Sequence, residues 1–292
     1  MHDHAQPGRQ SISGTLLIRR RRPRTLWAGG LVVAAVMLLA VVGPWISPYN
    51  PVAFAVQLRF SPPSVGHPFG TDEFGRDVFS RVLSGARYSL AIGFGAMAIS
   101  VAVGVPLGLL AAFHRGFVEA AIMRAVDLLI SLPPILLGLL ILAVTPPSLW
   151  KTIVAVGIVY IPILTRLTRA VALGLLEEDF VQAARARGEG AISILAREIL
   201  PNAWPPIIVE SGLRVTFAIL LGSSLSFLGL GPQPPSSEWG LMIAESRQFI
   251  DRAPWIGLAP GLCLCALLVA INLFGEGLRE QLDPRLRGRG DN

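Results

Sequence analysis

Long apolar stretches constrain the fold of this chain more than any other feature of its sequence. A helix needs about 20 predominantly apolar residues to cross the hydrocarbon core of a bilayer. Six stretches of about this size occur between charged residues, prolines and glycines, at 27–46, 88–112, 125–144, 152–167, 206–230 and 255–275. With 52% hydrophobic and only 15% charged residues, the chain is too apolar for a soluble domain. We therefore predict an all-α integral membrane protein with six transmembrane helices.

The distribution of basic residues predicts the orientation of these spans. Most of the 25 lysines and arginines fall in the N-terminal tail, in the loops after the second and fourth spans, and in the C-terminal tail. Cytoplasmic loops carry such an excess, so both termini are expected in the cytoplasm. The fourth stretch is short enough to be a re-entrant or buried segment instead. Without it, however, the arginine-rich residues 166–197 would face outward, so we keep six spans.

This topology divides the chain into five parts. A cytoplasmic tail covers 1–26, the first span 27–46, an extracytoplasmic segment 47–87, a five-helix core 88–276 and a second cytoplasmic tail 277–292. The arginines at 19–22 resemble a nucleic-acid patch or the start of a signal peptide. No small-x-small cleavage site follows, and five further spans do, so we interpret the first span as a retained anchor and expect no nucleic-acid partner.

The sequence offers no catalytic or cofactor site. A P-loop requires glycine immediately before its lysine, and the only lysine, Lys151, follows Trp150. Neither G-x-S-x-G nor H-E-x-x-H occurs, and the histidines and cysteines lack metal-ligand spacing. We expect neither an enzyme nor a metal site. A secondary transporter driven by an ion gradient stays an alternative, although it would use membrane-buried carboxylates and often repeated halves, and neither is visible.

The cytoplasmic stretch 177–202, after the fourth span, has the pattern of a helix, a turn and a second helix. Ala183 and Ala184 favour a helix, Gly188 can end it in the left-handed conformation, and Pro201 is expected to stop the second helix from continuing straight into the membrane. The alanines leave a flat face that suits another protein's groove. An ordinary amphipathic helix at the membrane surface is the alternative.

This stretch resembles the EAA loop of ABC importer permeases, with the pattern E-A-A-x3-G-x9-I-x-L-P. Residues at matching positions are Ala183, Ala184, Gly188, Leu200 and Pro201. Two positions depart, since Gln182 stands where glutamate is usual and Glu198 where isoleucine is usual. The resemblance implies that Gln182 and the matching residues contact an ATPase subunit, and glutamine can still form a hydrogen bond there.

A second segment resembles the signature G-T-D-x-x-G-R-D-x-x-S-R of dipeptide, oligopeptide and nickel permeases. It comprises Gly70, Thr71, Asp72, Gly75, Arg76, Asp77, Ser80 and Arg81. Further matches follow in the family's order at 225–231, Pro235, 239–240 and 282–285. Glycines permit tight turns, and Asp72 and Asp77 can cap backbone amides, so we expect a structural role for this segment. Docking of a substrate-binding protein is the second hypothesis.

Glu210 and Arg214 lie four residues apart at the start of the fifth span, a spacing that puts them on one helix face as an ion pair. Intramembrane charges of this kind are candidates for a transport pathway. The alternative is contact with lipid headgroups or water near the cytoplasmic end.

The resemblance implies a type I ABC importer transmembrane domain in the bacterial inner membrane. It further implies four kinds of partner: a second homologous permease, two ATP-binding cassette subunits that bind ATP and magnesium, an extracytoplasmic substrate-binding protein, and the lipid bilayer. Peptides are the implied substrates, with nickel complexes, opines or short oligosaccharides left open. A scaffold or receptor subunit is a further alternative, but it gives no reason for the alanine-rich helix.

Overall fold

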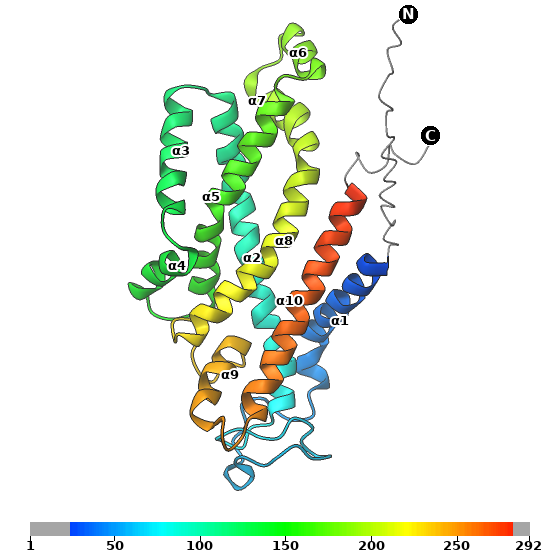
Figure 1. Cartoon of the computed structure of the whole chain (residues 1–292), viewed down its shortest axis with the longest axis vertical. Helices are drawn as coiled ribbons and strands as arrows, with labels where there is room; N and C mark the ends of the chain where they lie inside the picture. The colour runs from blue at the N-terminus through cyan, green and yellow to red at the C-terminus, as the bar shows by residue number, and fades with distance from the viewer. Residues whose placement is uncertain (1–23, 283–292) are drawn as a thin grey trace, which may run out of the picture.

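The computed structural model describes residues 24–282, and the secondary structure in this range is helical apart from an isolated bridge between Thr71 and Asp77 (Figure 1). The α-helices are α1 (Arg24–Ile46), α2 (Val78–Phe113), α3 (Phe117–Ile130), α4 (Pro134–Ala143), α5 (Leu149–Leu175), α6 (Asp179–Ala186), α7 (Ala191–Ser193), α8 (Leu200–Phe227), α9 (Trp239–Ser246) and α10 (Trp255–Leu282). Short 3₁₀ turns η1 (Val56–Leu58) and η3 (Arg247–Phe249) and a π-helical stretch η2 (Ile194–Ile199) complete the set. Most of both predicted tails, and Asp283, Pro284 and Arg285 of the last signature match, lie outside the described residues.

The predicted all-α membrane architecture is confirmed. Five helices of the described part are long and apolar enough to cross a membrane, and a bent pair of helices can supply a sixth span. The fourth span is no longer marginal, because α5 has 27 residues and extends past both ends of the apolar stretch from which it was predicted. Likewise α2 has 36 residues and begins at Val78, inside the segment expected to be extracytoplasmic.

The third predicted span is not one straight helix. It consists of α3 and α4, which meet at an angle of 92°. Pro133 and Pro134 lie at the break, where neither can donate a backbone hydrogen bond to the preceding turn. The two prolines therefore coincide with the point at which the span is divided.

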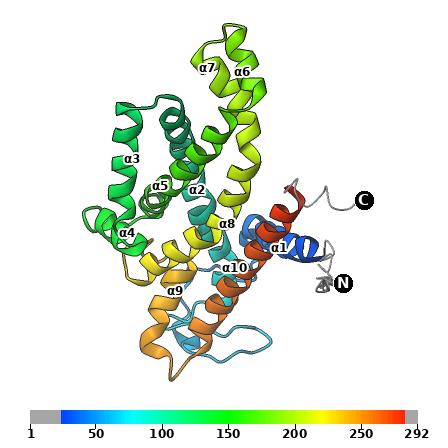
Figure 2. The same ribbon diagram turned by 45° about the horizontal axis from the view of Figure 1, so that its top comes forward.

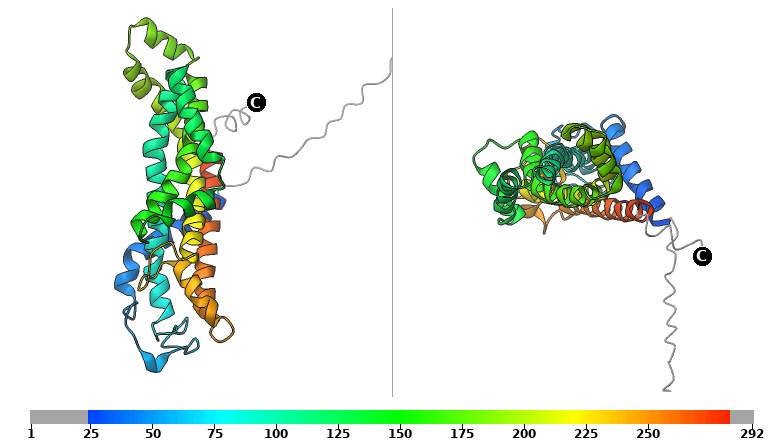
Figure 3. Two further views of the ribbon diagram at one scale, coloured as in Figure 1. Left: turned by 90° about the vertical axis from the view of Figure 1, so that its left-hand side faces the viewer. Right: turned by 90° about the horizontal axis from the view of Figure 1, so that it is seen from above.

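The helix pair α2 and α5 forms the centre of the bundle. Glycines in α2 let the two backbones approach closely: a Cβ atom on Gly104 would lie 2.9 Å from the carbonyl oxygen of Ile161, and one on Gly108 would lie 2.6 Å from that of Thr165. Helix α8 packs against both members of the pair. Seen from above, α1 and α10 lie together at one edge of the bundle and α3 at the other (Figure 3).

The two segments that carry the sequence signatures lie at opposite ends of the molecule. Helices α6 and α7 project at one end, while the loop 47–77 and α9 form the other (Figures 1 and 2). This separation is what a loop on each side of a membrane requires.

Candidate functional site

Helix α6 carries the alanine-rich part of the EAA-like stretch 177–202. Its inner face buries Val181 and Ala184 completely, and the helix packs against η2, whose Ile194 and Ile199 are also buried. On the outer face Gln182, Ala183 and Ala186 are exposed. The small exposed side chains leave a flat surface that a groove of another protein can approach closely.

Gly188 ends α6 as expected. Its φ angle is +78°, and its amide donates to the carbonyl of Arg185 at 2.9 Å, while the amide of Glu189 donates to that of Ala184 at 3.2 Å. A residue in the left-handed conformation with these bonds is a common helix ending, and it is easiest for glycine. The chain therefore turns sharply between α6 and α7.

The expectation that Pro201 stops the second helix is wrong. Helical structure continues from Ala191 to Phe227 through α7, η2 and α8, and both Leu200 and Pro201 lie in the first turn of α8. The amide of Leu200 donates to the carbonyl of Leu195, five residues back, as in a π-helix. This wider turn gives the proline ring room where a regular α-helical turn would bring it against a carbonyl.

Gln182 connects α6 to the end of α5. Its Nε2 donates to the carbonyl oxygen of Leu176, the residue that caps α5, at 3.0 Å. A glutamate could not donate this bond, so the departure from the usual residue has a structural counterpart. The other departure, Glu198, lies 3.5 Å from Arg187. Arg187 also binds Glu189 and holds the pKa of that carboxyl below its ordinary value through this hydrogen bond.

The signature segment at 70–81 forms a buried ion network around Asp72. One carboxylate oxygen of Asp72 accepts the amides of Phe74 and Arg76, each at 2.9 Å. The other accepts Nε of Arg76 at 2.6 Å and Nη1 of Arg81 at 2.7 Å. Asp72 and Arg81 are fully buried and Arg76 is 2% exposed, so the two guanidinium groups face one carboxylate inside the protein.

Glu245 completes this network from a distant part of the chain. Its carboxylate accepts a hydrogen bond from Nη2 of Arg81 at 2.9 Å and lies 3.6 Å from Arg76. The ion pair of Glu245 with Arg81 joins α9 to the start of α2. Glu73 binds Arg76 more weakly, at 3.3 Å, and burial raises the pKa of its carboxyl. Because Arg76 is enclosed by these contacts, its side chain does not present itself to another protein.

The remaining signature residues shape the turns around the network. Gly70 and Gly75 have φ angles of +68° and +74°, and a Cβ atom on Gly75 would clash with the carbonyl oxygen of Ala55. Asp77 caps α2 by accepting the amide of Ser80 at 2.7 Å. The carbonyl of Thr71 accepts the indole N–H of Trp255 at 3.1 Å, which ties the loop to α10. The turn chemistry expected of these residues is therefore present.

The structure brings Glu210 and Arg214 together on α8, with the carboxylate 2.6 Å from the guanidinium group. The guanidinium carbon of Arg214 lies 5.6 Å from the ring centre of Phe217. Sequence reasoning found this pair from its spacing. It missed Glu245 and Trp255, because each lies more than 160 residues from its partner, Arg81 and Thr71 respectively. A carboxylate in the mostly apolar helix α9 was the sequence signal that could have pointed to Glu245.

Comparison with known families decides the identity of this architecture. Residues 104–288 match the family described as the inner membrane component of binding-protein-dependent transport systems. The chain belongs to this family. Residues 16–63 also match the N-terminal transmembrane domain of oligopeptide transport permease C. The protein is thus an inner-membrane permease of an ABC importer, and family membership gives no support to the alternative of a gradient-driven transporter.

Relatives of the permease cover nearly its whole length. It is 41% identical over 266 residues to the di/tripeptide transport system permease protein DppC of Pseudomonas aeruginosa, covering 89% of this chain and 88% of that one. It is 40% identical over 271 residues to the glutathione transport system permease protein GsiD of Escherichia coli, covering 92% and 89%. The inward-facing MetNI methionine ABC transporter shares its fold, with a TM-score of 0.57 at 18% identity over 70% of this chain and 96% of that one. The type I importer fold is confirmed.

Proposed function

We propose that the permease forms the translocation pathway of an ATP-driven importer of di- and oligopeptides, together with a second homologous permease. Relatives named for dipeptides, tripeptides and glutathione support this substrate class, because all of these are short peptides. The proposal rests above all on α6, an exposed alanine-faced helix that lies at the end of the bundle and contacts the ends of two spanning helices. Two ATP-binding cassette subunits bind ATP and magnesium beneath the two permeases, and one of them docks on this helix.

The coupling step follows from how α6 is held. Gln182 binds the last turn of α5, and the buried face of α6 packs on η2, which continues into α8. A displacement of α6 by the ATPase therefore moves α5 and α8 together. Rigid-body motion of packed helices of this kind opens a pathway first to one side and then to the other. Glu210 and Arg214 on α8 lie along that pathway.

The opposite end of the bundle receives the substrate. The arginine distribution supports a cytoplasmic location for both termini and α6. The loop 47–77 and α9, at the opposite end of the bundle from α6, then lie outside (Figure 1). A substrate-binding protein docks at this outer end. Because Arg76 is buried, docking uses exposed side chains beside the ion network, such as Phe54 and Phe74, which are 65% and 44% exposed.

Reconstitution tests the proposed function. Liposomes are prepared that contain this permease, the second permease and candidate ATPases. The binding protein and a labelled dipeptide are then added on the side of the membrane to which the binding protein docks. Uptake that requires ATP hydrolysis is the expected result. Uptake driven by a proton or sodium gradient without ATP would contradict the proposal and favour a secondary transporter.

Replacing Gly188 by valine tests the coupling role of α6. The left-handed conformation costs an ordinary residue about 1–2 kcal/mol, and a β-branched side chain resists it further. The turn should shift and displace α6, so we expect ATP-dependent transport to fall severalfold while the complex still assembles. Gly190→Val is the matched control, because Gly190 has a φ angle of −72° and open space around it. Full transport by the Gly188 variant would argue against coupling through this turn.

A further inference from the structure

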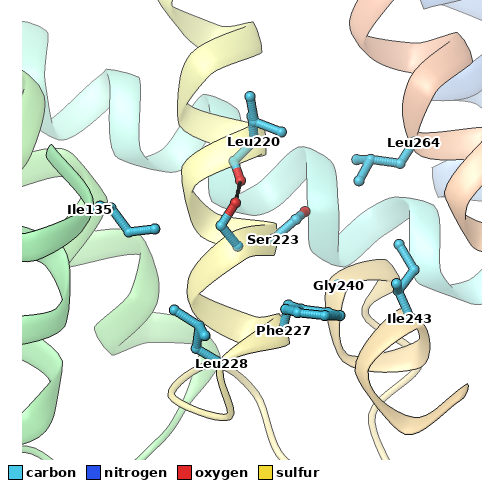
Figure 4. A pocket seen from close by; sticks show the side chains of 9 residues that line it. Ile135, Leu220, Ser223, Phe227, Leu228, Gly240, Ile243 and Leu264 are labelled. Atoms are coloured by element: carbon cyan, nitrogen blue, oxygen red, sulfur yellow. Dashed lines mark hydrogen bonds between the residues drawn. The ribbon is translucent and has the colours of Figure 1, made fainter. Parts of the chain in front are cut away.

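An apolar cavity of about 290 Å³ lies between four helices on one side of the bundle (Figure 4). Helix α8 forms its back wall, the first turn of α4 one side, and α9 and α10 the other. Its lining side chains are apolar apart from Ser223 and Ser224. Leu220 and Leu228 remain 47% and 50% exposed, so the cavity is open to a molecule that approaches α8.

The polar atoms of this lining are already engaged by the chain itself. Ser224 donates its hydroxyl to the carbonyl of Leu220 at 2.8 Å. Ser223 donates to Glu238 at 3.4 Å, and the same carboxylate also accepts the amides of Gly240 and Leu241 at the start of α9. A charged group inside the cavity would therefore be left without compensation, whereas an apolar side chain would be stabilised there.

A cation lies at the edge of the cavity. The guanidinium carbon of Arg247, in η3, is 4.5 Å from the ring centre of Phe227, one of the lining residues. Nε of Arg247 donates to the carbonyl of Ala244 at 3.2 Å, and within residues 24–282 no carboxylate lies within ion-pairing distance of it. The edge of the cavity thus offers an available positive charge next to an apolar hollow.

We infer that this cavity and Arg247 form a subsite for the C-terminal end of the transported peptide, with the last side chain in the cavity and the carboxylate on the guanidinium group. The inference rests on the proposed function, in which peptides pass along α8. Arginine and an apolar pocket together match a group that is anionic and apolar at once. The volume is close to the lower end of the range of about 300–1,000 Å³ found for small-molecule sites, so it suits part of a short peptide.

The position of the subsite on α8 agrees with this use. Arg214, Phe217, Leu220, Ser224 and Leu228 follow one another at intervals of three or four residues, so they share one face of the helix. That face leads from the cavity to the ion pair of Glu210 and Arg214. A peptide released from the subsite would therefore meet groups of both charges, as its own two termini require.

The test compares maximal transport rates of two dipeptides in the reconstituted complex, with the binding protein saturated by each. Leu220→Trp fills the cavity and should slow Ala-Leu about tenfold while Ala-Ala stays within about twofold of wild type, because the larger side chain loses its place. Leu262→Trp is the control, since Leu262 is exposed on α10 and does not line the cavity.

Arg247→Gln should slow transport of both dipeptides about three- to fivefold, which corresponds to the loss of an exposed ion pair. Its control is Arg252→Gln, because Arg252 lies over Phe60 instead.

The outcomes separate the subsite from the proposed function. If wild type shows ATP-dependent uptake and both cavity-side variants transport the two dipeptides at wild-type rates, the subsite is wrong and the proposed function stands. The same result is expected if lipid or the second permease occupies the cavity. If wild type shows no ATP-dependent peptide uptake, the proposed function fails and the subsite fails with it. Should Leu220→Trp not assemble, the comparison of Arg247→Gln with Arg252→Gln decides alone.

Discussion

Replacing Asp72 by alanine is expected to destabilise the permease by about 3–5 kcal/mol, because it leaves buried arginines without their shared carboxylate. Asp72 accepts the side chains of both Arg76 and Arg81 as well as two backbone amides. Breaking a buried ion pair from one side costs far more than the pair itself contributes. Unfolding by denaturant in detergent, followed by tryptophan fluorescence, measures the change in free energy.

Glu73→Gln is the matched control for this prediction. Glu73 forms one long hydrogen bond to Arg76, so we expect its replacement to change the free energy of unfolding by no more than about 1 kcal/mol. Burial raises the pKa of the Glu73 carboxyl above its ordinary value of 4.5. In wild type this group therefore contributes to stability at pH values below 4.5, and the contribution is lost as the pH rises through the raised pKa. The Glu73 variant should lack this loss. Equal stability of the Asp72 and Glu73 variants would contradict a central role for Asp72.

Replacing Gly108 by alanine is expected to destabilise the bundle by about 1–3 kcal/mol through overpacking. The added Cβ atom would lie 2.6 Å from both the carbonyl oxygen of Thr165 and the Cβ atom of Thr168, closer than such atoms can approach. The backbones of α2 and α5 would have to separate along their shared length. Thermal unfolding in detergent, read by loss of the monodisperse peak in size-exclusion chromatography, measures the effect.

Gly174→Ala provides the control on the partner helix. Gly174 lies in α5 with no atom within 4 Å of an added Cβ, so alanine should be neutral or stabilise the helix by up to about 1 kcal/mol. If Gly108→Ala behaves like Gly174→Ala, close contact between α2 and α5 at Gly108 does not contribute to stability.

The features that could be predicted from the sequence are those encoded locally. Apolar runs mark the spans, the left-handed turn at Gly188 follows from its lack of a side chain, and the caps formed by Asp72 and Asp77 depend on amides a few residues away. Local rules also mislead, as at Pro201, where a π-helical turn keeps the helix intact. Pro133 and Pro134 explain the break before α4, but they do not by themselves fix the angle of 92° between α3 and α4.

Features that depend on distant parts of the chain could not be predicted. Arginines are usually exposed, so the burial of Arg76 and Arg81 appears only when the fold brings Glu245 beside them. The cavity has the same origin, because its walls combine α4 with the much later helices α8, α9 and α10. The candidate coupling residues lie within one short segment, and for that reason they could be identified from the sequence.

The length of α2 has a practical consequence. At 1.5 Å per residue, its 36 residues extend about 54 Å, whereas the hydrocarbon core is about 30 Å thick. Part of this helix therefore extends beyond the hydrocarbon core, and its first turns are buried at the end of the bundle where the ion network fastens α2 to α9. An antibody fragment raised against that rigid end could bind the transporter without contacting lipid, and it would serve as a fiducial marker for imaging the assembled complex.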